Sequence, residues 1–207
     1  VQALRGVNLI LHSGEVLALL GENGAGKSTL IKILGGAYRA DAGVVEMAGT
    51  PRHFGSPQDS RRAGVAVIYQ EFNLVPGLTA SENIYLGREP GTAGFIARSR
   101  ERRDAAALFR RLGVDIDLDV PCHRLTTAQQ QLVEIAKALA FESRIIVMDE
   151  PTAALTSHEV SRLFSIIGDL KRQGIGVVYI SHRLDEIDSI ADRVTVLRDG
   201  LNVGERM

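Results

Sequence analysis

One stretch of this chain has the residue types and the spacing to bind a phosphate group. It is the glycine-rich run Gly21-Glu22-Asn23-Gly24-Ala25-Gly26-Lys27-Ser28-Thr29, which follows an apolar strand pattern and precedes a helix pattern. Glycines let successive backbone N–H groups curl around an anion, and the positive end of the helix dipole adds to the attraction. The ammonium of Lys27 can reach the outer phosphates of a nucleotide, and the Ser28 hydroxyl can bind Mg²⁺. The run predicts a nucleotide phosphate site made of Gly21, Asn23, Gly24, Ala25, Gly26, Lys27, Ser28 and Thr29.

Two adjacent acids form a second candidate for chemistry. Asp149 and Glu150 end the apolar run Ile145-Ile146-Val147-Met148. Burying two neighbouring carboxylates is costly unless a cation or a proton is shared between them. Because the glycine loop implies Mg²⁺, we expect Asp149 to hold this ion through water and Glu150 to orient and deprotonate an attacking water. In isolation, the same pair would be read as two acids that cap a strand edge.

Two further polar residues, Gln70 and His182, each follow a predicted core strand. Ligands of open α/β folds bind at the carboxyl ends of the strands, so both residues are candidates for the same site. If the strands are parallel, His182 lies level with Asp149 and Glu150 and can reach a γ-phosphate or its water. Taken alone, a glutamine at a strand end is usually a surface residue, and a lone histidine is usually structural.

Alternating strand and helix patterns supply the elements that position these residues. Strands are predicted at 7–11, 16–20, 44–47, 65–69, 144–150 and 176–180, and a closing hairpin at 193–205. Helices are predicted at 27–34, 79–87 and 98–112, after a capping threonine within 125–131, and from Thr156 to the stop at Gly174. The first two strands are expected to pair with each other. The pattern indicates an α/β fold with a helical insert that begins near Phe72.

Length and composition allow a globular protein with a sizeable core. The chain has 207 residues and 45% hydrophobic content, with 24 Lys and Arg against 25 Asp and Glu. This balance gives no net field that would concentrate a polyanion or an anionic membrane surface. Apolar runs extend to about five residues, whereas roughly 20 are needed to span a bilayer. The single cysteine, Cys122, favours a reducing compartment and is interpreted as a buried apolar residue.

An arginine cluster within the predicted helical insert could suggest phosphate or DNA binding. Glu101 and Asp104 are interleaved with these arginines, however, and no aromatic stacking platform accompanies them. A solvated helix face is therefore the better interpretation of Arg98, Arg100, Arg102 and Arg103.

Five motifs occur in the order and spacing that are typical of ATP-binding-cassette domains, and together they cover nearly the whole chain. They are the glycine loop, Gln70, the stretch Leu125 to Gln129, the Asp149-Glu150 strand and His182. The chain most resembles the first nucleotide-binding domain of the tandem ATPases that power bacterial monosaccharide importers of the ribose, galactose and xylose type. Residues 21–29, 70–74 and 129–139 carry this closer resemblance.

The resemblance implies a fold, a domain division and a set of residue roles. The fold would be an α/β P-loop NTPase core with an antiparallel β subdomain and a helical subdomain. Residues 1–70 and 143–207 would form the core, and residues 71–142 would form the helical subdomain. Gln70 would be a metal ligand beside Ser28 and Asp149, would sense the γ-phosphate, and would precede a loop that contacts a permease. The signature residues Leu125, Thr126, Thr127, Ala128 and Gln129 would bind ATP held by an opposing domain.

The same resemblance implies a function and partners. The chain would bind and hydrolyse ATP with Mg²⁺, through Lys27, Gln70, Glu150 and His182, and would couple hydrolysis to monosaccharide uptake. Its partners would be a second nucleotide-binding domain, transmembrane permease subunits and, indirectly, a sugar-binding protein, with no nucleic acid. It would lie at the cytoplasmic face of the inner membrane. The first residue is Val1 and not Met, so we expect a fragment whose second cassette lies in a missing C-terminal half.

Three departures from the family pattern affect these expectations. Thr126, Thr127 and Ala128 replace the Ser, Gly and Gly of the general signature, and a Cβ at the two glycine positions restricts backbone approach to a phosphate. Thr156 replaces the Asp that is common after the paired acids. The aromatic residue that stacks on adenine would precede Val1, so base affinity should be reduced.

Two alternative functions remain open from the sequence. One is a non-transport ATPase of the same family that acts on ribosomes or nucleic acid, which would need a basic surface or an inserted arm. The other is an ATP-binding regulatory subunit with little turnover, which the residues Thr127 and Ala128 favour. The sequence does not identify the sugar.

Overall fold

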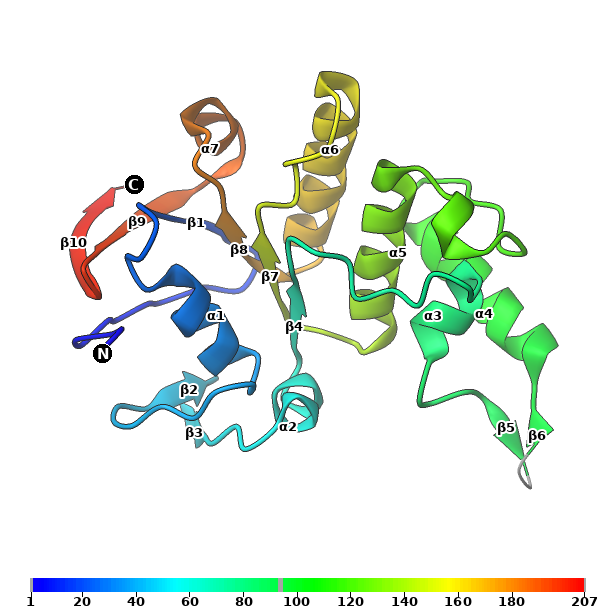
Figure 1. The fold of residues 1–207 in the computed structure, drawn as a ribbon, viewed down its shortest axis with the longest axis horizontal. Coiled ribbons are helices and arrows are strands. Elements are labelled where there is room, and N and C mark those ends of the chain that lie inside the picture. Colours follow the sequence, from blue (N-terminus) through cyan, green and yellow to red (C-terminus); the bar gives the residue numbers. More distant parts are fainter. Residues whose placement is uncertain (1, 93–94, 207) are drawn as a thin grey trace. The chain divides into compact units, whose positions relative to one another are not determined.

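The computed structural model describes residues 2–92 and 95–206, which form two compact units (Figure 1). The first unit contains Val1–Val67, Ser143–Glu150 and Leu170–Met207, and the second contains Ile68–Glu142 and Pro151–Asp169. The second unit thus includes residues 151–169, which the predicted domain division assigns to the core.

A six-stranded sheet organises the first unit. Its strand order is β10-β9-β1-β8-β7-β4, and the pairs β9–β1, β1–β8 and β8–β7 are parallel, whereas β10 runs antiparallel to β9. The strands are β1 (Val16–Gly21), β4 (Val65–Ile68), β7 (Ile145–Asp149), β8 (Gly176–Ile180), β9 (Arg193–Arg198) and β10 (Leu201–Arg206). Its helices are α1 (Lys27–Leu34), α2 (Pro57–Arg62) and α7 (Leu184–Ile190), and β2 (Val45–Met47) and β3 (Thr50–Arg52) form a separate antiparallel hairpin.

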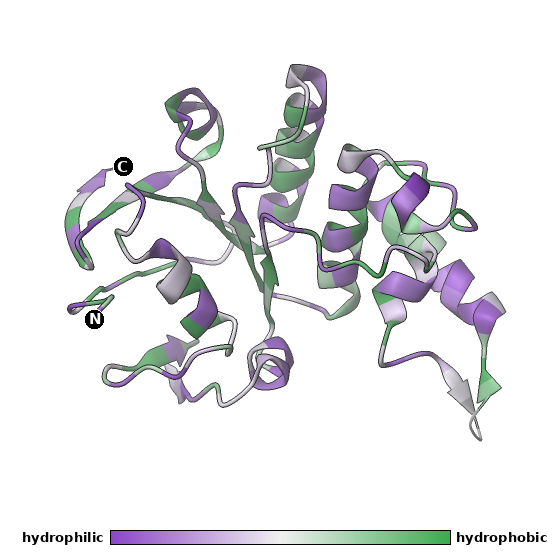
Figure 2. Ribbon diagram, viewed as in Figure 1, coloured by the Kyte–Doolittle hydropathy of each residue, from purple (hydrophilic) through white to green (hydrophobic). Residues whose placement is uncertain are grey.

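The strands at the centre of the sheet are mainly hydrophobic, as Figure 2 shows. Side chains of β1, β7 and β8 are fully buried, among them Leu17, Val147 and Tyr179. Continuous apolar runs of this kind are typical of parallel strands that are covered on both faces. Within the described residues, no helix is both long and apolar enough to cross a membrane.

Strand register brings the carboxyl ends of three strands to one level. Ile180 of β8 pairs with Asp149 of β7 on one side and with Leu19 of β1 on the other. The glycine loop, which begins at Gly21, therefore leaves the sheet at the same edge as the segments that follow Asp149 and Ile180.

The predicted strand at 7–11 and its pairing with β1 are both wrong. No strand is assigned there, and both edges of β1 are occupied, by β8 and β9. Asn8 instead binds the Asn202 side chain: its N–H donates to Oδ1, and its carbonyl accepts from Nδ2, both at 2.8 Å. The Asn8 backbone thus pairs with a side chain and not with the backbone of a neighbouring strand.

Four helices and a short hairpin account for most of the second unit. They are α3 (Ala80–Tyr85), β5 (Gly91–Thr92), β6 (Phe95–Ile96), α4 (Arg98–Arg111), α5 (Thr127–Ala140) and most of α6 (Ser157–Arg172), with a 3₁₀ turn at Cys122–Arg124. The helix α3 packs against both α4 and α5. Cys122 is buried as predicted, and burial raises the pKa of its thiol.

Four arginines in the first half of α4, Arg98, Arg100, Arg102 and Arg103, are exposed and pair with acids. Arg98 contacts Glu82 and Glu101, and Arg102 makes two hydrogen bonds to Asp119. Arg100 and Arg103 both contact Asp104. This agrees with the predicted solvated helix face.

Candidate active site

The glycine loop between β1 and α1 is held open by backbone geometry that only glycine accepts easily. Gly26 has a φ of 105°, and a Cβ there would lie 2.7 Å from the Leu4 side chain and 2.9 Å from the Ala3 carbonyl oxygen. A Cβ at Gly21 would lie 2.5 Å from the carbonyl oxygen of Leu197. Gly21 and Gly26 are therefore required by close packing, whereas Gly24, with a φ of 83°, has open space around it.

The helix α1 begins directly after this loop with no side-chain cap. Gly26 occupies the N-cap position, where most helices place a side-chain acceptor. The first N–H groups of an α-helix have no partner within the helix, so here they remain available to an anion. Ser28 is an exposed residue of this first turn.

Lys27 folds back over the loop that precedes it. Its Nζ donates hydrogen bonds to the carbonyl oxygens of Gly21, at 2.5 Å, and Glu22, at 3.0 Å. These contacts hold the ammonium against the glycine loop. An ammonium donates three hydrogen bonds, so one remains for a phosphate oxygen without displacement of the other two.

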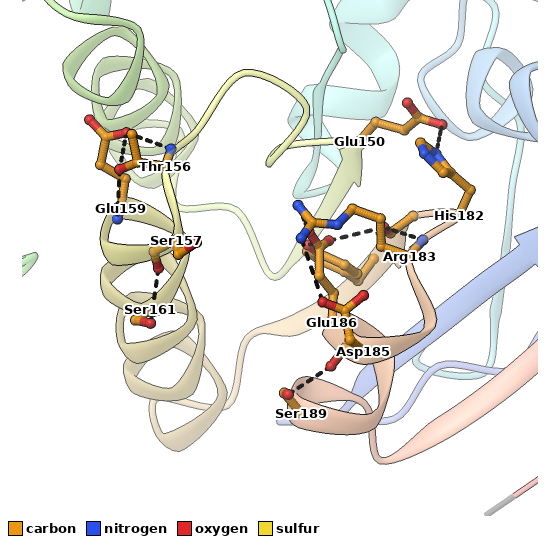
Figure 3. Close-up of polar contacts among 12 residues, drawn as sticks. Glu150, Thr156, Ser157, Glu159, Ser161, His182, Arg183, Asp185, Glu186 and Ser189 are labelled. Carbon is orange, nitrogen blue, oxygen red and sulfur yellow. Dashed lines mark hydrogen bonds and ion pairs between the residues drawn. The ribbon is translucent and has the colours of Figure 1, made fainter.

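The predicted acid and imidazole groups meet at the same edge of the sheet. Figure 3 shows the His182 ring pointing to the Glu150 carboxylate, and Nδ1 lies 3.1 Å from Oε1. A carboxylate can only accept a hydrogen bond, so Nδ1 carries the proton. In the neutral ring Nε2 is then an acceptor. The structure thus brings Glu150 and His182 together, at the edge from which the glycine loop leaves the sheet.

Glu150 has an unusual backbone conformation. Its φ is 47°, in the left-handed region that residues with a Cβ rarely adopt, and its N–H donates to the Ile180 carbonyl oxygen at 2.9 Å. Such conformations cost about 1–3 kcal/mol and persist where the surroundings enforce them. The strained turn directs the Glu150 side chain to His182, an arrangement that the sequence pattern does not reveal.

Asp149 lies in a site that disfavours its charge. Burial raises the pKa of this carboxyl, the neighbouring Glu150 raises it further, and the ammonium of Lys27 lowers it. A divalent cation would compensate the same burial, and the Ser28 hydroxyl and Asp149 carboxylate are hard oxygen donors of the kind that Mg²⁺ prefers. These residues therefore fit the expected ion.

Changing Asp149 to Asn is expected to stabilise the ligand-free chain at neutral pH. The native pKa lies above the ordinary value, so between these two values the native chain keeps a proton that the unfolded chain has released. The stability contributed by Asp149 is complete below the ordinary pKa and is lost as pH rises through the raised native pKa. Thermal unfolding of both proteins from acidic to neutral pH should give equal Tm values at the acidic end and a higher Tm for the variant at neutral pH.

The control for this experiment is Asp188→Asn, which changes an exposed carboxylate on α7. It should leave the difference between acidic and neutral Tm unchanged. An Asp149→Asn variant that is less stable than the wild type at neutral pH would contradict the predicted direction.

Beneath His182 lies a polar network that the sequence reasoning missed. Glu186, which is 2% exposed, accepts hydrogen bonds from Tyr179 Oη at 2.8 Å and Ser181 Oγ at 3.0 Å. Its other carboxylate oxygen is 2.8 Å from the Arg183 guanidinium (Figure 3). In the sequence, Glu186 is marked only by its place one helical turn beyond Ser181-His182. Because no helix was predicted there, Glu186 could not be assigned to the site.

Gln70 belongs to the second unit and lies exposed, two residues beyond the end of β4. The loop that follows it is attached to α5: the Asn73 N–H donates to Glu134 at 2.7 Å, and Lys137 donates to the Asn73 carbonyl oxygen at 3.1 Å. The role of Gln70 at the metal and γ-phosphate site stays a prediction.

The signature stretch forms the start of α5 in the second unit. Thr126 caps this helix: its hydroxyl accepts from the Gln129 N–H at 3.2 Å, and Gln129 Oε1 accepts from the Thr126 N–H at 2.9 Å. Leu125 is buried, whereas Thr126 is exposed and Thr127 and Ala128 are half-buried. The Thr126 side chain therefore bonds to the backbone of its own helix. The next two residues, Thr127 and Ala128, each carry a Cβ.

The same capping chemistry recurs at α6. Thr156 and Glu159 exchange hydrogen bonds between side chain and backbone, as the spacing predicts (Figure 3). Between the starts of α5 and α6, within the second unit, lies a cavity of about 280 Å³. Its lining includes Thr126, Ala128, Gln131, His158 and Arg162.

Comparison with known proteins finds similar sequences and similar folds. The profile of a family described as ABC transporter matches residues 4–153. The ribose import ATP-binding protein RbsA 2 of Burkholderia ambifaria is 55% identical over 201 residues, which are 97% of this chain but 40% of that protein. The chain thus spans about 40% of the length of this curated relative.

Two solved structures have the same fold. A nucleotide-free ATP-binding cassette from an ABC transporter has a TM-score of 0.87 and 29% identity, and the match covers 98% of this chain and 84% of that one. A dimeric ATP-binding cassette in a post-hydrolysis state with ADP and Pi has a TM-score of 0.82 and 28% identity, over 99% of this chain and 90% of that one.

Proposed function

Because this chain belongs to the ABC transporter family, we propose that it is a nucleotide-binding domain that binds ATP with Mg²⁺ and hydrolyses it to ADP and phosphate. The observation that carries the proposal is the meeting of the glycine loop, the acid pair and His182 at one edge of the sheet. Phosphoryl transfer to water needs little covalent chemistry from the protein, and positioned charge supplies most of the rate.

Each residue of this edge has a distinct task in the proposed reaction. The N–H groups at the start of α1 and the Lys27 ammonium hold the phosphate oxygens. The Glu150 carboxylate accepts a proton from the attacking water, and His182 holds that carboxylate in place through Nδ1–H. Ser28 and Asp149 would hold Mg²⁺, which, when bound, neutralises charge on the phosphate oxygens. Gln70 is proposed to join them as a further metal ligand.

We propose further that the complete protein powers monosaccharide uptake. The name of the relative that is 55% identical, a ribose import ATP-binding protein, supports this class of substrate. In such a system the ATPase would attach to transmembrane permease subunits at the cytoplasmic face of the inner membrane, and a separate protein would deliver the sugar. A second nucleotide-binding domain is expected, since a similar cassette is described as dimeric.

An ATP site that an opposing domain completes would give a direct test of the proposed function. If the signature residues of an opposing domain complete each ATP site, the isolated chain should hydrolyse ATP slowly, and its rate per molecule should rise with protein concentration. Phosphate release at fixed ATP and Mg²⁺ over a wide range of protein concentration measures this dependence. Fast turnover that is independent of concentration would contradict a shared site, and no turnover by the full-length protein in a complete transporter would contradict hydrolysis itself.

One observation favours a second function, that of an ATP-binding regulatory domain with little turnover. Thr127 and Ala128 are half-buried in the first turn of α5 and carry Cβ groups where the general signature has glycines. These groups reduce the approach of a phosphate to the helix start. Replacement of both residues by Gly should raise turnover by the full-length protein if the signature limits hydrolysis.

A further inference from the structure

We propose that Glu186 and Ser181 are positioning residues that hold His182 against Glu150. The inference rests on the proposed hydrolysis of ATP, because it explains how an essential imidazole of that reaction is kept in place. Neither residue would touch the nucleotide, and both would act through the backbone of His182.

The exposed position of His182 makes such a device necessary. The imidazole side chain is 71% exposed, so packing does little to restrain its rotation and displacement. It must nevertheless remain within hydrogen-bond distance of Glu150, 3.1 Å away. A side chain in this situation can be located only by its hydrogen bond and by the backbone on either side of it.

Both neighbours of His182 in the sequence contact the same buried carboxylate, Ser181 through a hydrogen bond and Arg183 through an ion pair. Ser181 precedes His182 and donates its hydroxyl to Glu186 at 3.0 Å, and Arg183 follows it and pairs with Glu186 at 2.8 Å. Ser181 and Glu186 are 5% and 2% exposed. Tyr179, on β8, donates to the same oxygen as Ser181 and so ties the carboxylate to the central sheet.

The direction of each hydrogen bond follows from the chemistry of the carboxylate. An ionised carboxylate accepts but cannot donate, so the Ser181 hydroxyl proton must point to Glu186. The lone pairs of the same oxygen then face the other way, and Ser181 Oγ accepts from the Arg183 N–H at 3.1 Å. This second bond spans His182 and closes a small ring around its backbone. Glu186 therefore sets the Ser181 rotamer, and Ser181 sets the backbone that carries His182.

Two substitutions break this ring at different points. Ser181→Ala removes the acceptor for the Arg183 N–H, and Ser181→Thr keeps a hydroxyl there. Glu186→Gln preserves shape, but one side of the amide is a donor. The N–H₂ group of the new side chain must therefore face either the two hydroxyl groups or the Arg183 guanidinium. The contacts on that side are weakened, because a donor then faces donors. The control is Asp188→Asn, which changes an exposed carboxylate of the same helix.

The first measurement uses the ligand-free chain and does not depend on activity. Hydrogen exchange of the Arg183 amide reports its hydrogen bond to Ser181 Oγ. The NMR signals of the His182 imidazole report its contact with Glu150. Ser181→Ala and Glu186→Gln should speed exchange of this amide and move the ring signals, whereas Ser181→Thr and Asp188→Asn should leave both as in the wild type. Unchanged exchange and ring signals in Ser181→Ala would overturn the proposal.

The second measurement is ATP turnover by the full-length protein. We expect Ser181→Ala and Glu186→Gln to lower kcat about tenfold, the order of effect that a small misplacement of a reacting group produces, with the KM for ATP unchanged. In a His182→Ala background neither change should lower kcat further, because both act through His182. An additional loss in that background, or a parallel rise in KM, would indicate general structural damage and overturn the proposal.

The two measurements also separate this inference from the proposed function. If the amide and ring signals respond as expected but the wild-type protein hydrolyses no ATP, the positioning role stands and the hydrolytic function fails. If the wild type hydrolyses ATP and the variants match it in kcat, the function stands and the positioning role fails.

Discussion

Replacing Glu150 by Gln is expected to lower ATP turnover about a thousandfold while nucleotide binding is retained. A positioned general base contributes about 10²- to 10⁴-fold to a rate, and an amide cannot accept the proton of the attacking water. Gln keeps the length of the side chain and can still accept a hydrogen bond from His182 Nδ1, so the geometry of the pair should survive. Single-turnover phosphate release and equilibrium ATP binding measure the two properties separately.

The same variant should also change the assembly state. With hydrolysis blocked, a closed pair of domains has no route to reset, so an ATP-bound dimer should accumulate. Light scattering after size exclusion, with and without ATP and Mg²⁺, detects it. Glu46→Gln, which changes an exposed residue of β2, is the control and should match the wild type in rate and in mass. Unchanged turnover and unchanged dimerisation in Glu150→Gln would remove Glu150 from the proposed role.

Replacing Lys27 by Ala is expected to weaken ATP binding about a hundredfold or more. The ammonium is held beside the helix start by the carbonyl oxygens of Gly21 and Glu22, where it can pair with a phosphate. Hydrogen bonds to charged groups contribute about 1.5–3 kcal/mol each, and every 1.4 kcal/mol is about tenfold in affinity. Loss of the ammonium removes the charge and also a cross-link within the loop.

A matched control exists on the same helix. Lys32 lies in the last turn of α1, with its Nζ 5.0 Å from the centre of the Tyr38 ring, so Lys32→Ala removes an equal charge away from the loop. Calorimetric titration with ATP should show wild-type affinity for Lys32→Ala and little binding by Lys27→Ala. If both variants bind alike, the affinity reflects general electrostatic attraction and not a specific phosphate contact.

Local patterns made much of the fold predictable. The helix α1 has the predicted bounds, Lys27–Leu34, because glycines precede and follow a short amphipathic run. The capping boxes at Thr79, Thr126 and Thr156 occur where Ser or Thr precedes Glu or Gln by three residues. The α/β cassette fold predicted from the motifs is confirmed by the solved cassettes, with a TM-score of 0.87 for one of them.

Other elements escaped prediction because their signals are not local. Residues 7–11 have strand composition, but both edges of β1 are occupied by more distant segments, and the Asn8 backbone binds the Asn202 side chain of β10. The helix α7 is short, and its sequence alternates acids with apolar residues in too few turns to give a clear period. Without α7, Glu186 had no place in the site.

The sequence alone determined which chemical groups this protein has: a phosphate-binding loop with Lys27, an acid pair at the end of an apolar strand, and a histidine after another. These depend on residue type and on spacing along the chain, which a sequence records directly. Only the tertiary structure decided that β8 lies between β1 and β7, so that Ile180 pairs with Asp149 and His182 meets Glu150. Strand order and register arise from packing between segments far apart in sequence, and hydrophobic periodicity within one segment does not specify its neighbour. The same reason explains why the buried carboxylate of Glu186, which contacts both neighbours of His182, became visible only in the folded chain.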